Sequence, residues 1–184
     1  MRFLTAGSDG LLVETDDLAQ ALALFERLQN AALTGCLELV PAARTVMLRF
    51  DPLLTDIAAL RAAIEALPLG RGTAREGDTF EIPVVYDGED LAEIAELLRC
   101  SIDEVIRRHT AAIHTVAFTG FAPGFAYMTS DDPRFDVPRR RSPRVRIPAG
   151  SVALAGKFSG IYPAESPGGW QLLGRTPMKM WDLS

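Results

Sequence analysis

The stretch His114-Thr-Val-Ala-Phe-Thr-Gly-Phe-Ala-Pro-Gly-Phe-Ala-Tyr-Met128 is the most informative part of this chain. Two later segments share its character, Pro148-Ala-Gly-Ser-Val152 and Ser166-Pro-Gly-Gly-Trp170. Glycine permits close backbone approach, proline fixes a turn, and aromatic rings supply rigid walls. Such segments are typical of a preformed groove for a small polar molecule or, alternatively, of a β-barrel that needs tight corners.

The composition changes sharply at these segments. Eight of the 12 prolines and eight of the 15 glycines lie from Gly120 onward, where helical periodicity disappears. Short apolar runs, such as Thr115 to Phe118 and Val152 to Ala155, alternate there with turns. This pattern predicts an all-β unit in the form of a barrel.

The first part of the chain shows the regular periodicities of strands and helices. Thr15 and Thr55 are expected to cap two amphipathic helices, and Pro68 is expected to end the second. Strands are expected around these helices at residues 10–14, 36–40, 46–50 and 80–86. The resulting order, β-α-β-β-α-β, is the split βαβ or ferredoxin-like pattern.

Two short helices are expected between these regions. Asp90 can start the first, and Ser101-Ile-Asp-Glu104 has the form of a capping box for the second. The sequence therefore predicts an α+β protein with a ferredoxin-like domain at 1–86, a helical connector at 87–112 and a β-barrel at 113–184. Such a fold serves many functions and names none by itself.

Composition limits the classes of function. The chain has 184 residues, of which 48% are hydrophobic and 23% charged, and its net charge is −5. This is typical of a globular protein without general attraction to nucleic acid or anionic lipid. The apolar runs are too short to span a bilayer, and Cys36 and Cys100 are isolated. We therefore expect no nucleic-acid partner, no membrane, and a cytoplasmic location.

Several common catalytic motifs are absent from the sequence. It contains no phosphate loop, no dinucleotide-binding glycine motif after a strand and no nucleophile elbow. His109 and His114 are the only histidines, and neither has partners at metal-ligand spacing, so no metal is expected. His114 is the best candidate for a catalytic base, although a place at the end of a strand explains it as well.

Polar and cationic groups in the predicted barrel are the remaining candidates for chemistry. Lys157 joins His114 as a candidate catalytic residue, and Arg144 and Arg175 are the first candidates for binding an anion, because arginine forks match carboxylates. At each of these positions, a structural role is the alternative to contact with a ligand. We expect the substrate-binding residues to be Phe121, Pro123, Gly124, Phe125, Tyr127, Arg139, Arg144, Ser151, Tyr162, Ser166, Gly168, Gly169, Trp170 and Arg175, which would line one groove.

These segments resemble one known family. The motifs are residues 115–127, Pro138-Arg139, Pro143-Arg144, residues 148–152, Gly160-Ile-Tyr-Pro163, residues 166–170 and Gly174-Arg-Thr-Pro177. They are similar to those of the allophanate hydrolase subunit 1 family, which includes the B subunit of 5-oxoprolinase and the KipI kinase inhibitor. They also resemble subdomains C and D of the carboxyltransferase part of urea carboxylase. Leu37–Pro41 and Phe50-Asp-Pro52 fit as well, so the likeness extends over the whole chain.

The resemblance implies a ferredoxin-like domain followed by a cyclophilin-like β-barrel, and a partner known as the C subunit or subunit 2. It implies membership of an ATP-dependent amide or lactam hydrolase, with ATP as a cofactor of the assembled complex. Because the sequence shows no nucleophile motif and no phosphate loop, we expect this chain to be inactive alone. Characterised enzymes of this type open 5-oxoproline to glutamate, and a small amide or lactam is therefore the expected substrate.

The sequence departs from the family pattern at two places. Phe158 stands where many members have glutamine, and the loss of that amide can change substrate preference. The chain ends at Trp181-Asp-Leu-Ser184, whereas relatives usually continue into a final strand. A barrel without its last strand would have an unpaired edge, so either this sequence is shortened or a partner fills the gap.

Other interpretations of the sequence remain open. One is a carboxyltransferase half-domain that passes a carboxyl group from biotin to a urea-like amide. A second is a non-enzymatic inhibitor of a histidine kinase. A third, a DNA-binding helix-turn-helix at Leu91 to Arg108, conflicts with the acidic residues Asp103 and Glu104 on its second helix and with the acidic chain.

Overall fold

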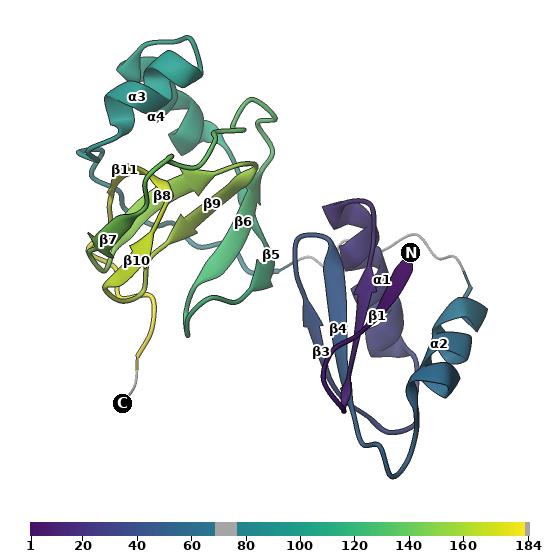
Figure 1. Ribbon diagram of the computed structural model, residues 1–184. Helices are drawn as coiled ribbons and strands as arrows, with labels where there is room; N and C mark the ends of the chain where they lie inside the picture. The colour runs from purple at the N-terminus through teal and green to yellow at the C-terminus, as the bar shows by residue number, and fades with distance from the viewer. Residues whose placement is uncertain (69–76, 183–184) are drawn as a thin grey trace. The chain divides into compact units, whose positions relative to one another are not determined.

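The computed structural model describes residues 1–68 and 77–182. The chain divides into two compact units, Met1–Asp78 and Thr79–Ser184 (Figure 1). The first unit contains the elements β1 (Arg2–Thr5), β2 (Gly10–Glu14), α1 (Leu18–Asn30), β3 (Cys36–Pro41), β4 (Thr45–Phe50) and α2 (Ile57–Ala66). Its antiparallel strands form one sheet in the order β1-β2-β4-β3.

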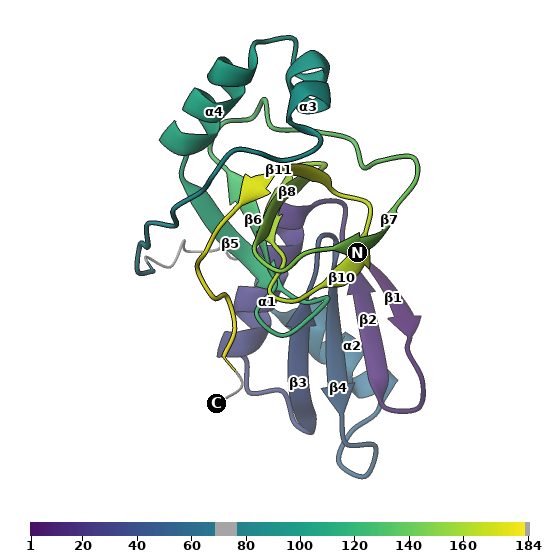
Figure 2. The same cartoon turned by 90° about the vertical axis from the view of Figure 1, so that its left-hand side faces the viewer.

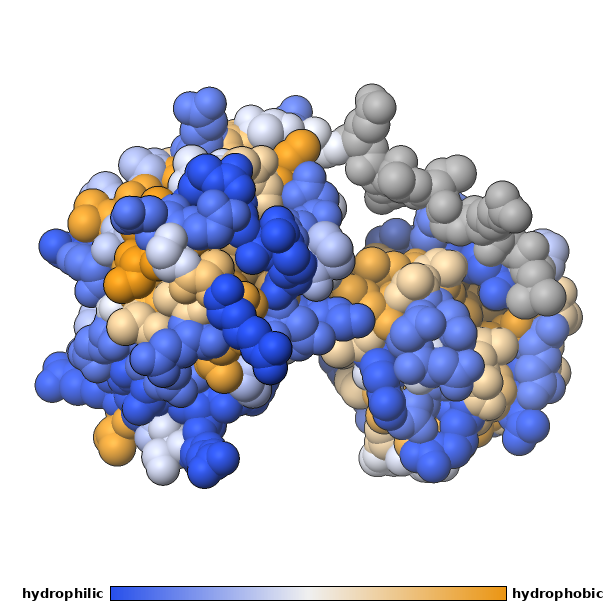
Figure 3. Space-filling view, turned by 90° about the horizontal axis from the view of Figure 1, so that it is seen from above, coloured by the Kyte–Doolittle hydropathy of each residue, from blue (hydrophilic) through white to orange (hydrophobic). Residues whose placement is uncertain are grey.

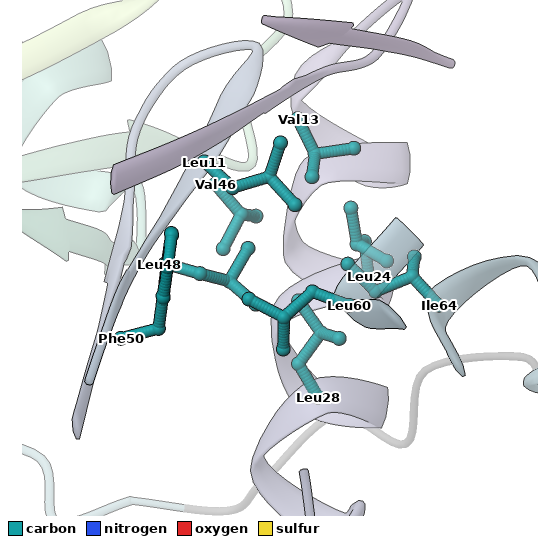
Figure 4. Packing of buried hydrophobic residues seen from close by; sticks show 9 residues of the cluster. All are labelled: Leu11, Val13, Leu24, Leu28, Val46, Leu48, Phe50, Leu60 and Ile64. Atoms are coloured by element: carbon teal, nitrogen blue, oxygen red, sulfur yellow. The ribbon is translucent and has the colours of Figure 1, made fainter. Parts of the chain in front are cut away.

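The core of the first unit follows directly from the strand and helix periodicities. In the register of β2 and β4, Leu11 lies opposite Leu48 and Val13 opposite Val46, so these side chains share one face of the sheet. Both helices pack their apolar sides on that face (Figure 4). The fully assembled core consists of Leu11, Val13, Leu24, Leu28, Val46, Leu48, Phe50, Leu60 and Ile64.

The helix caps differ from the expected residues. Asp17 caps α1 by accepting a hydrogen bond from the Gln20 amide, and Asp56 caps α2 by accepting one from the Ala59 amide, each at 2.8 Å. The prediction of Thr15 and Thr55 as caps is therefore wrong. The Thr15 hydroxyl lies instead within 3.1 Å of the Asp17 and Arg44 carbonyl oxygens, which holds the chain before α1.

The expected strand at 80–86 is also wrong. Val85 alone makes an isolated bridge, to Arg175. The sheet position beside β2 belongs to β1, so the order of the first unit is β-β-α-β-β-α. The segment Arg2-Phe-Leu-Thr was missed because it is short and does not alternate between polar and apolar residues.

The second unit combines two helices with two antiparallel sheets. Its elements are α3 (Leu91–Leu97), α4 (Ile102–Ala111), β5 (His114–Thr119), β6 (Ala126–Ser130), β7 (Arg144–Ile147), β8 (Ser151–Ala155), β9 (Phe158–Ile161), β10 (Ser166–Gly168) and β11 (Gln171–Arg175). Five strands form a sheet in the order β11-β8-β9-β6-β5, and β10 pairs with β7. Asp90 stands at the start of α3, as expected, and the helices lie together beside β11 (Figures 1 and 2).

The larger sheet is buried on both faces along β8, because alternate residues of a strand point to opposite sides. Leu154 packs with α3 and α4 residues such as Ile94 and Val105. Ala153 and Ala155 pack on the other side with Phe125 and Tyr162. Residues 85–90 cover the outer edge of β11, where Val85 and Arg175 exchange backbone hydrogen bonds of 2.8 and 2.9 Å.

The surface carries no single dominant apolar area on the face shown in Figure 3, where hydrophobic residues lie scattered among hydrophilic ones. Scattered apolar residues are normal on folded proteins. None of the described helices is both long and apolar enough to cross a membrane.

Candidate functional site

The three glycine-rich segments of the sequence come together in the second unit through their aromatic rings. The Phe125 ring lies edge-on to the rings of Tyr127, Tyr162 and Trp170, with centroids 5.0, 5.5 and 5.4 Å away. Edge-to-face contacts at these distances are favourable. We call the whole set the aromatic cluster; its members are Phe118, Phe121, Phe125, Tyr127, Phe158, Tyr162 and Trp170.

The glycines of these segments make room for other parts of the protein. A Cβ at Gly160 would lie 2.7 Å from the Phe125 ring, and a Cβ at Gly168 would collide with the Tyr162 hydroxyl. Gly124, with φ of +80°, would place a Cβ 2.7 Å from Trp181 Cβ. The expected segments therefore converge, and their glycines allow a dense aromatic interior to form.

Phe121 is the exception in this dense region. It has a φ of +69°, which non-glycine residues rarely adopt, and it is 59% exposed. Its ring lies 5.3 Å from that of Phe125 and 6.2 Å from that of Tyr162. An exposed aromatic residue held in a strained conformation beside buried rings is a candidate wall of a binding site.

Arg144 binds carboxylates of its own unit. Its Nη1 donates to Asp90 at 2.9 Å and its Nη2 to Asp90 at 2.8 Å and to Glu89 at 3.0 Å. Arg140 also binds Asp90, and the Leu172 amide donates to the same carboxylate at 2.7 Å. We call this arrangement the Asp90 clamp. An anionic substrate would have to displace Asp90 in order to use the Arg144 fork.

Burial alone would raise the pKa of Asp90, which is 3% exposed. The hydrogen bonds from Arg144 and the Leu172 amide, with the charges of Arg144 and Arg140, outweigh burial and hold that pKa below its ordinary value. Asp90 is therefore an ionised anchor that ties the start of α3 to β7 and β11. Sequence analysis recognised Asp90 only as a helix start, because its ion pairs with Arg140 and Arg144, which lie 50 and 54 residues away, leave no local signal.

Arg175 and Arg139, the other arginines predicted to bind an anion, differ in their ion pairing. Arg175 is largely exposed and pairs with Asp87 at 2.8 Å. The Arg139 guanidinium lies over the Trp170 ring, 5.9 Å from its centroid. Within the part of the chain that the structure describes, no carboxylate pairs with Arg139. Arg139 is thus the predicted anion-binding arginine whose charge is free beside the aromatic cluster.

The two candidate catalytic residues have different surroundings. Lys157 is exposed between β8 and β9, and no described carboxylate pairs with it. His114 begins β5, and its Nε2 lies 3.2 Å from the His109 carbonyl oxygen. Its position at a strand end agrees with the structural alternative, while its role as a base stays a prediction.

His109 forms a buried group that sequence analysis did not single out. Its Nδ1 lies 2.8 Å from the Tyr86 hydroxyl, and its ring lies 4.5 Å from that of His114. Burial, assisted by the charge of His114, lowers the pKa of His109 to about 3. His109 Nε2 and His114 Nδ1 are buried without a hydrogen-bond partner among the described residues. Both imidazoles belong to the packing of α4 on β5.

The other predicted site residues differ in burial and in hydrogen bonding. Ser151 is buried at the start of β8, and its carbonyl accepts from the Tyr162 amide at 2.9 Å. The Ser166 hydroxyl donates to the Ala164 carbonyl at 3.1 Å. The Gly169 carbonyl accepts from the Arg140 amide at 2.8 Å, and Pro123 is exposed. These residues shape the loops around the aromatic cluster.

Two hollows lie elsewhere. One, of about 430 Å³, is bordered by Arg107, Arg108, Asp131, Asp132 and Arg134, among others. There Asp132 accepts from Arg108 and Arg134, and these hydrogen bonds lower its pKa. The other, of about 480 Å³, is in the first unit and includes Glu14, which pairs with Arg2 and Arg44. In each hollow one carboxylate is shared by two arginines, and the described residues form no metal-ligand group.

The chain matches, over residues 1–184, the family described as "Carboxyltransferase domain, subdomain C and D". The B subunit of 5-oxoprolinase from Bacillus subtilis is 48% identical over 104 residues, which make up 55% of this chain and 43% of that protein. The corresponding protein of Haemophilus influenzae is 38% identical over 136 residues, 72% of this chain and 61% of that protein. The chain therefore spans about half the length of these curated relatives.

Among solved structures, the urea amidolyase of K. lactis is similar, with a TM-score of 0.78 and 21% identity over 95% of this chain and 13% of that chain. At this identity the likeness shows the fold alone. It confirms a mixed α and β fold with antiparallel sheets, and the match over the whole chain confirms the resemblance found in the sequence. The chain belongs to the carboxyltransferase subdomain C and D family, and its relatives include the B subunits of 5-oxoprolinase.

Proposed function

We propose that this chain is the B-type subunit of an ATP-dependent 5-oxoprolinase that opens the lactam of 5-oxoproline to glutamate. Its partner is the C-type protein, or subunit 2, of the same system, and the complex works in the cytoplasm. The observation that carries this proposal is an identity of 38–48% with three curated 5-oxoprolinase B subunits. Identity at this level between proteins of one family supports a shared reaction more strongly than a shared fold does.

Several cations of this chain are unavailable to a phosphate group, although Arg139 and Lys157 have no carboxylate partner among the described residues. A phosphate cradle needs free cations or a ring of backbone amides. Arg140 and Arg144 are bound to Asp90, and Arg146 pairs with Glu165 at 2.8 Å. The proposal assigns ATP to the assembled complex, and this chain, whose sequence has no phosphate loop, is not expected to be active alone.

The contribution of this chain is to bind and orient the substrate. Amides are poor electrophiles, so a lactam must be held with its carbonyl open to attack. Phe121, the exposed ring of the aromatic cluster, supplies a rigid apolar surface, and Arg139 supplies an unpaired positive charge over Trp170. This combination suits a small polar ring with a negative group.

The finer description of the fold is part of the same proposal. The sheet order β1-β2-β4-β3 with two helices on one face supports a ferredoxin-like first unit, in which β1 takes the place of the expected last strand. The five-stranded sheet and the β7–β10 pair support a cyclophilin-like barrel.

Co-purification with the partner subunits tests this function. We expect the complex to release glutamate from 5-oxoproline only when ATP is present, and to leave urea and allophanate unchanged. Release of carbon dioxide or ammonia from urea or allophanate, without turnover of 5-oxoproline, would contradict the proposal.

A carboxyltransferase function is the second candidate, because the K. lactis urea amidolyase shares the fold with a TM-score of 0.78. Such a function requires a biotin-bearing partner. Carboxylation of urea that depends on added biotinylated protein would support this alternative, and the substrate comparison above separates the two.

A further inference from the structure

Arg139 and Trp170 belong to two segments of the chain that are fastened to each other close to these residues. The Arg139 guanidinium lies over the Trp170 ring, 5.9 Å from its centroid. The Arg140 amide donates a hydrogen bond to the Gly169 carbonyl at 2.8 Å. Arg140 directly follows Arg139 in the chain, and Gly169 directly precedes Trp170. A backbone hydrogen bond therefore joins the two segments one residue away from the ring contact.

The Asp90 carboxylate joins the same two segments a second time. It accepts hydrogen bonds from the Arg140 side chain and from the Leu172 amide, the latter at 2.7 Å. Leu172 follows Trp170 by two residues. Asp90 is 3% exposed and is also bound by Arg144 at 2.9 and 2.8 Å. It is therefore a fixed point to which both segments are attached.

The contact with Trp170 is too weak to hold the Arg139 side chain by itself. Arg139 is exposed, and no carboxylate among the described residues pairs with it. At an exposed site, a cation–π contact contributes about as much free energy as the immobilisation of one long side chain costs. The position of the Arg139 guanidinium therefore depends on where its backbone is placed, and Arg140 and Asp90 place that backbone.

We propose that Asp90, acting through the Arg140 side chain, is a positioning residue that keeps Arg139 over Trp170. The inference rests on the proposed function in one respect, because it takes Arg139 as the group that meets the negative charge of the substrate. Asp90 and Arg140 do not contact the substrate themselves. They reduce the conformational freedom that Arg139 loses on binding, so they act on the affinity for the substrate and not on the reaction of the bound substrate.

Nuclear magnetic resonance of the full chain measures this positioning without any ligand. A proton above the face of an aromatic ring is shifted upfield, so the Arg139 Nε–H signal reports on the contact with Trp170. Its loss in Arg139→Gln identifies the signal. We expect Arg140→Gln to move it towards the position of a free arginine, because the bond to Asp90 is lost. Arg140→Lys should restore most of the upfield shift, because Asp90 binds a single nitrogen of Arg140 and not its fork.

Arg141→Gln is the matched control. Arg141 is the next residue after Arg140, is exposed and has no carboxylate partner among the described residues. The control therefore removes the same charge from the same loop without removing a bond to Asp90, and we expect it to leave the Nε–H signal unchanged. Arg140→Gln leaves Asp90 bound to Arg144 and to the Leu172 amide, so both variants should keep the spectrum of a folded chain.

Steady-state kinetics of the assembled complex separate positioning from a merely structural role. We expect Arg140→Gln to raise the KM for 5-oxoproline about 3- to 10-fold and to change kcat by less than about twofold. Arg141→Gln should change neither. In the Arg139→Gln background, Arg140→Gln should raise KM no further, because Arg140 acts only through Arg139. A loss of folded complex would instead lower kcat and leave KM as it is.

Three results would overturn the inference: an Arg139 Nε–H signal that Arg140→Gln does not move, an equal movement in Arg141→Gln, or an effect of Arg140→Gln on KM that persists in the Arg139→Gln background. Its failure is distinguishable from failure of the proposed function. A complex that releases glutamate with a KM unchanged by Arg140→Gln would reject the positioning role and keep the function. An Arg139 signal that responds as expected, in a complex that never releases glutamate, would do the reverse.

Discussion

The two units are stabilised by different kinds of interior. The described core of the first unit consists of Leu, Val, Ile and Phe side chains contributed by neighbouring strands and helices. The second unit adds buried polar groups, among them Asp90, Arg108, His109 and Gln171. Asp90 and Arg144 are 54 residues apart in sequence. Apolar periodicity therefore explains the first unit, while the second also depends on ion pairs between distant loops.

Replacing Asp90 with alanine should cause the largest loss in the second unit. It removes the acceptor that Arg140, Arg144 and the Leu172 amide share and leaves Arg144 only Glu89, which is expected to cost about 3–5 kcal/mol of unfolding free energy. Both tryptophans and all three tyrosines lie between residues 86 and 181, so tryptophan fluorescence during urea unfolding follows this unit.

Glu165→Gln is the matched control, since it removes one exposed partner of Arg146 and should hardly move the unfolding midpoint. An Asp90→Ala chain that unfolds at the wild-type urea concentration would show that the Asp90 clamp does not stabilise the fold.

Replacing Leu48 with alanine tests the first unit in the same way. Leu48 is fully buried opposite Leu11, and the cavity should cost about 2–5 kcal/mol. We expect an earlier loss of circular dichroism with little change in the tryptophan transition. Leu53→Ala, at a position that is 91% exposed, should change neither. Equal shifts of both signals by Leu48→Ala would mean that the units unfold together.

Acid should weaken the second unit through His109. Its pKa falls from 6.5 to about 3 on burial, so the unfolded chain binds a proton that the folded chain does not bind between these values. Stability is then expected to decrease by up to about 1.4 kcal/mol for each pH unit below 6.5. Asp90, whose pKa is also lowered, acts in the same direction at lower pH.

His109→Gln keeps an acceptor for the Tyr86 hydroxyl and removes this titration. Urea midpoints measured from pH 7 to about pH 5 should then vary less with pH than in the wild type. An unchanged pH dependence would assign the acid sensitivity to other groups.

The smallest expected effect distinguishes the observed helix cap from its neighbour. Asp17→Ala removes the acceptor of the Gln20 amide and should cost about 1 kcal/mol, measured by circular dichroism of the first unit. Asp16→Ala, one residue earlier and exposed, should cost less. A larger loss of stability in Asp16→Ala than in Asp17→Ala would mean that the helix begins before Asp17.

The sequence predicted the elements whose apolar residues recur at the spacing of a strand or of a helix. The residues of the first core were readable because Leu11, Leu48 and Ile64 lie at strand or helix spacings. Sequence reasoning missed β1, which is too short to show a pattern, and it predicted a strand at residues 80–86, where the structure has only the Val85 bridge. Strand pairing between distant segments, such as Val85 with Arg175, leaves no local signal.

The convergence of the glycine-rich segments was predictable, whereas their detailed contacts were not, and their role as a binding site stays a prediction. Glycines, prolines and aromatic residues correctly indicated which loops converge around Phe125. The sequence could not tell Arg139 from Arg144, because the difference lies in Asp90, which reaches Arg144 from a helix start far along the chain. Charge pairing of this kind is a property of the folded chain alone.

Reconstitution tests the central claim most directly. Partner subunits, ATP and 5-oxoproline are mixed with and without this chain, and glutamate is measured. The proposed function predicts release of glutamate only in the complete mixture. Glutamate released at the same rate without this chain, or none in a complex that has assembled fully, would contradict the claim that it is the B-type subunit of a 5-oxoprolinase.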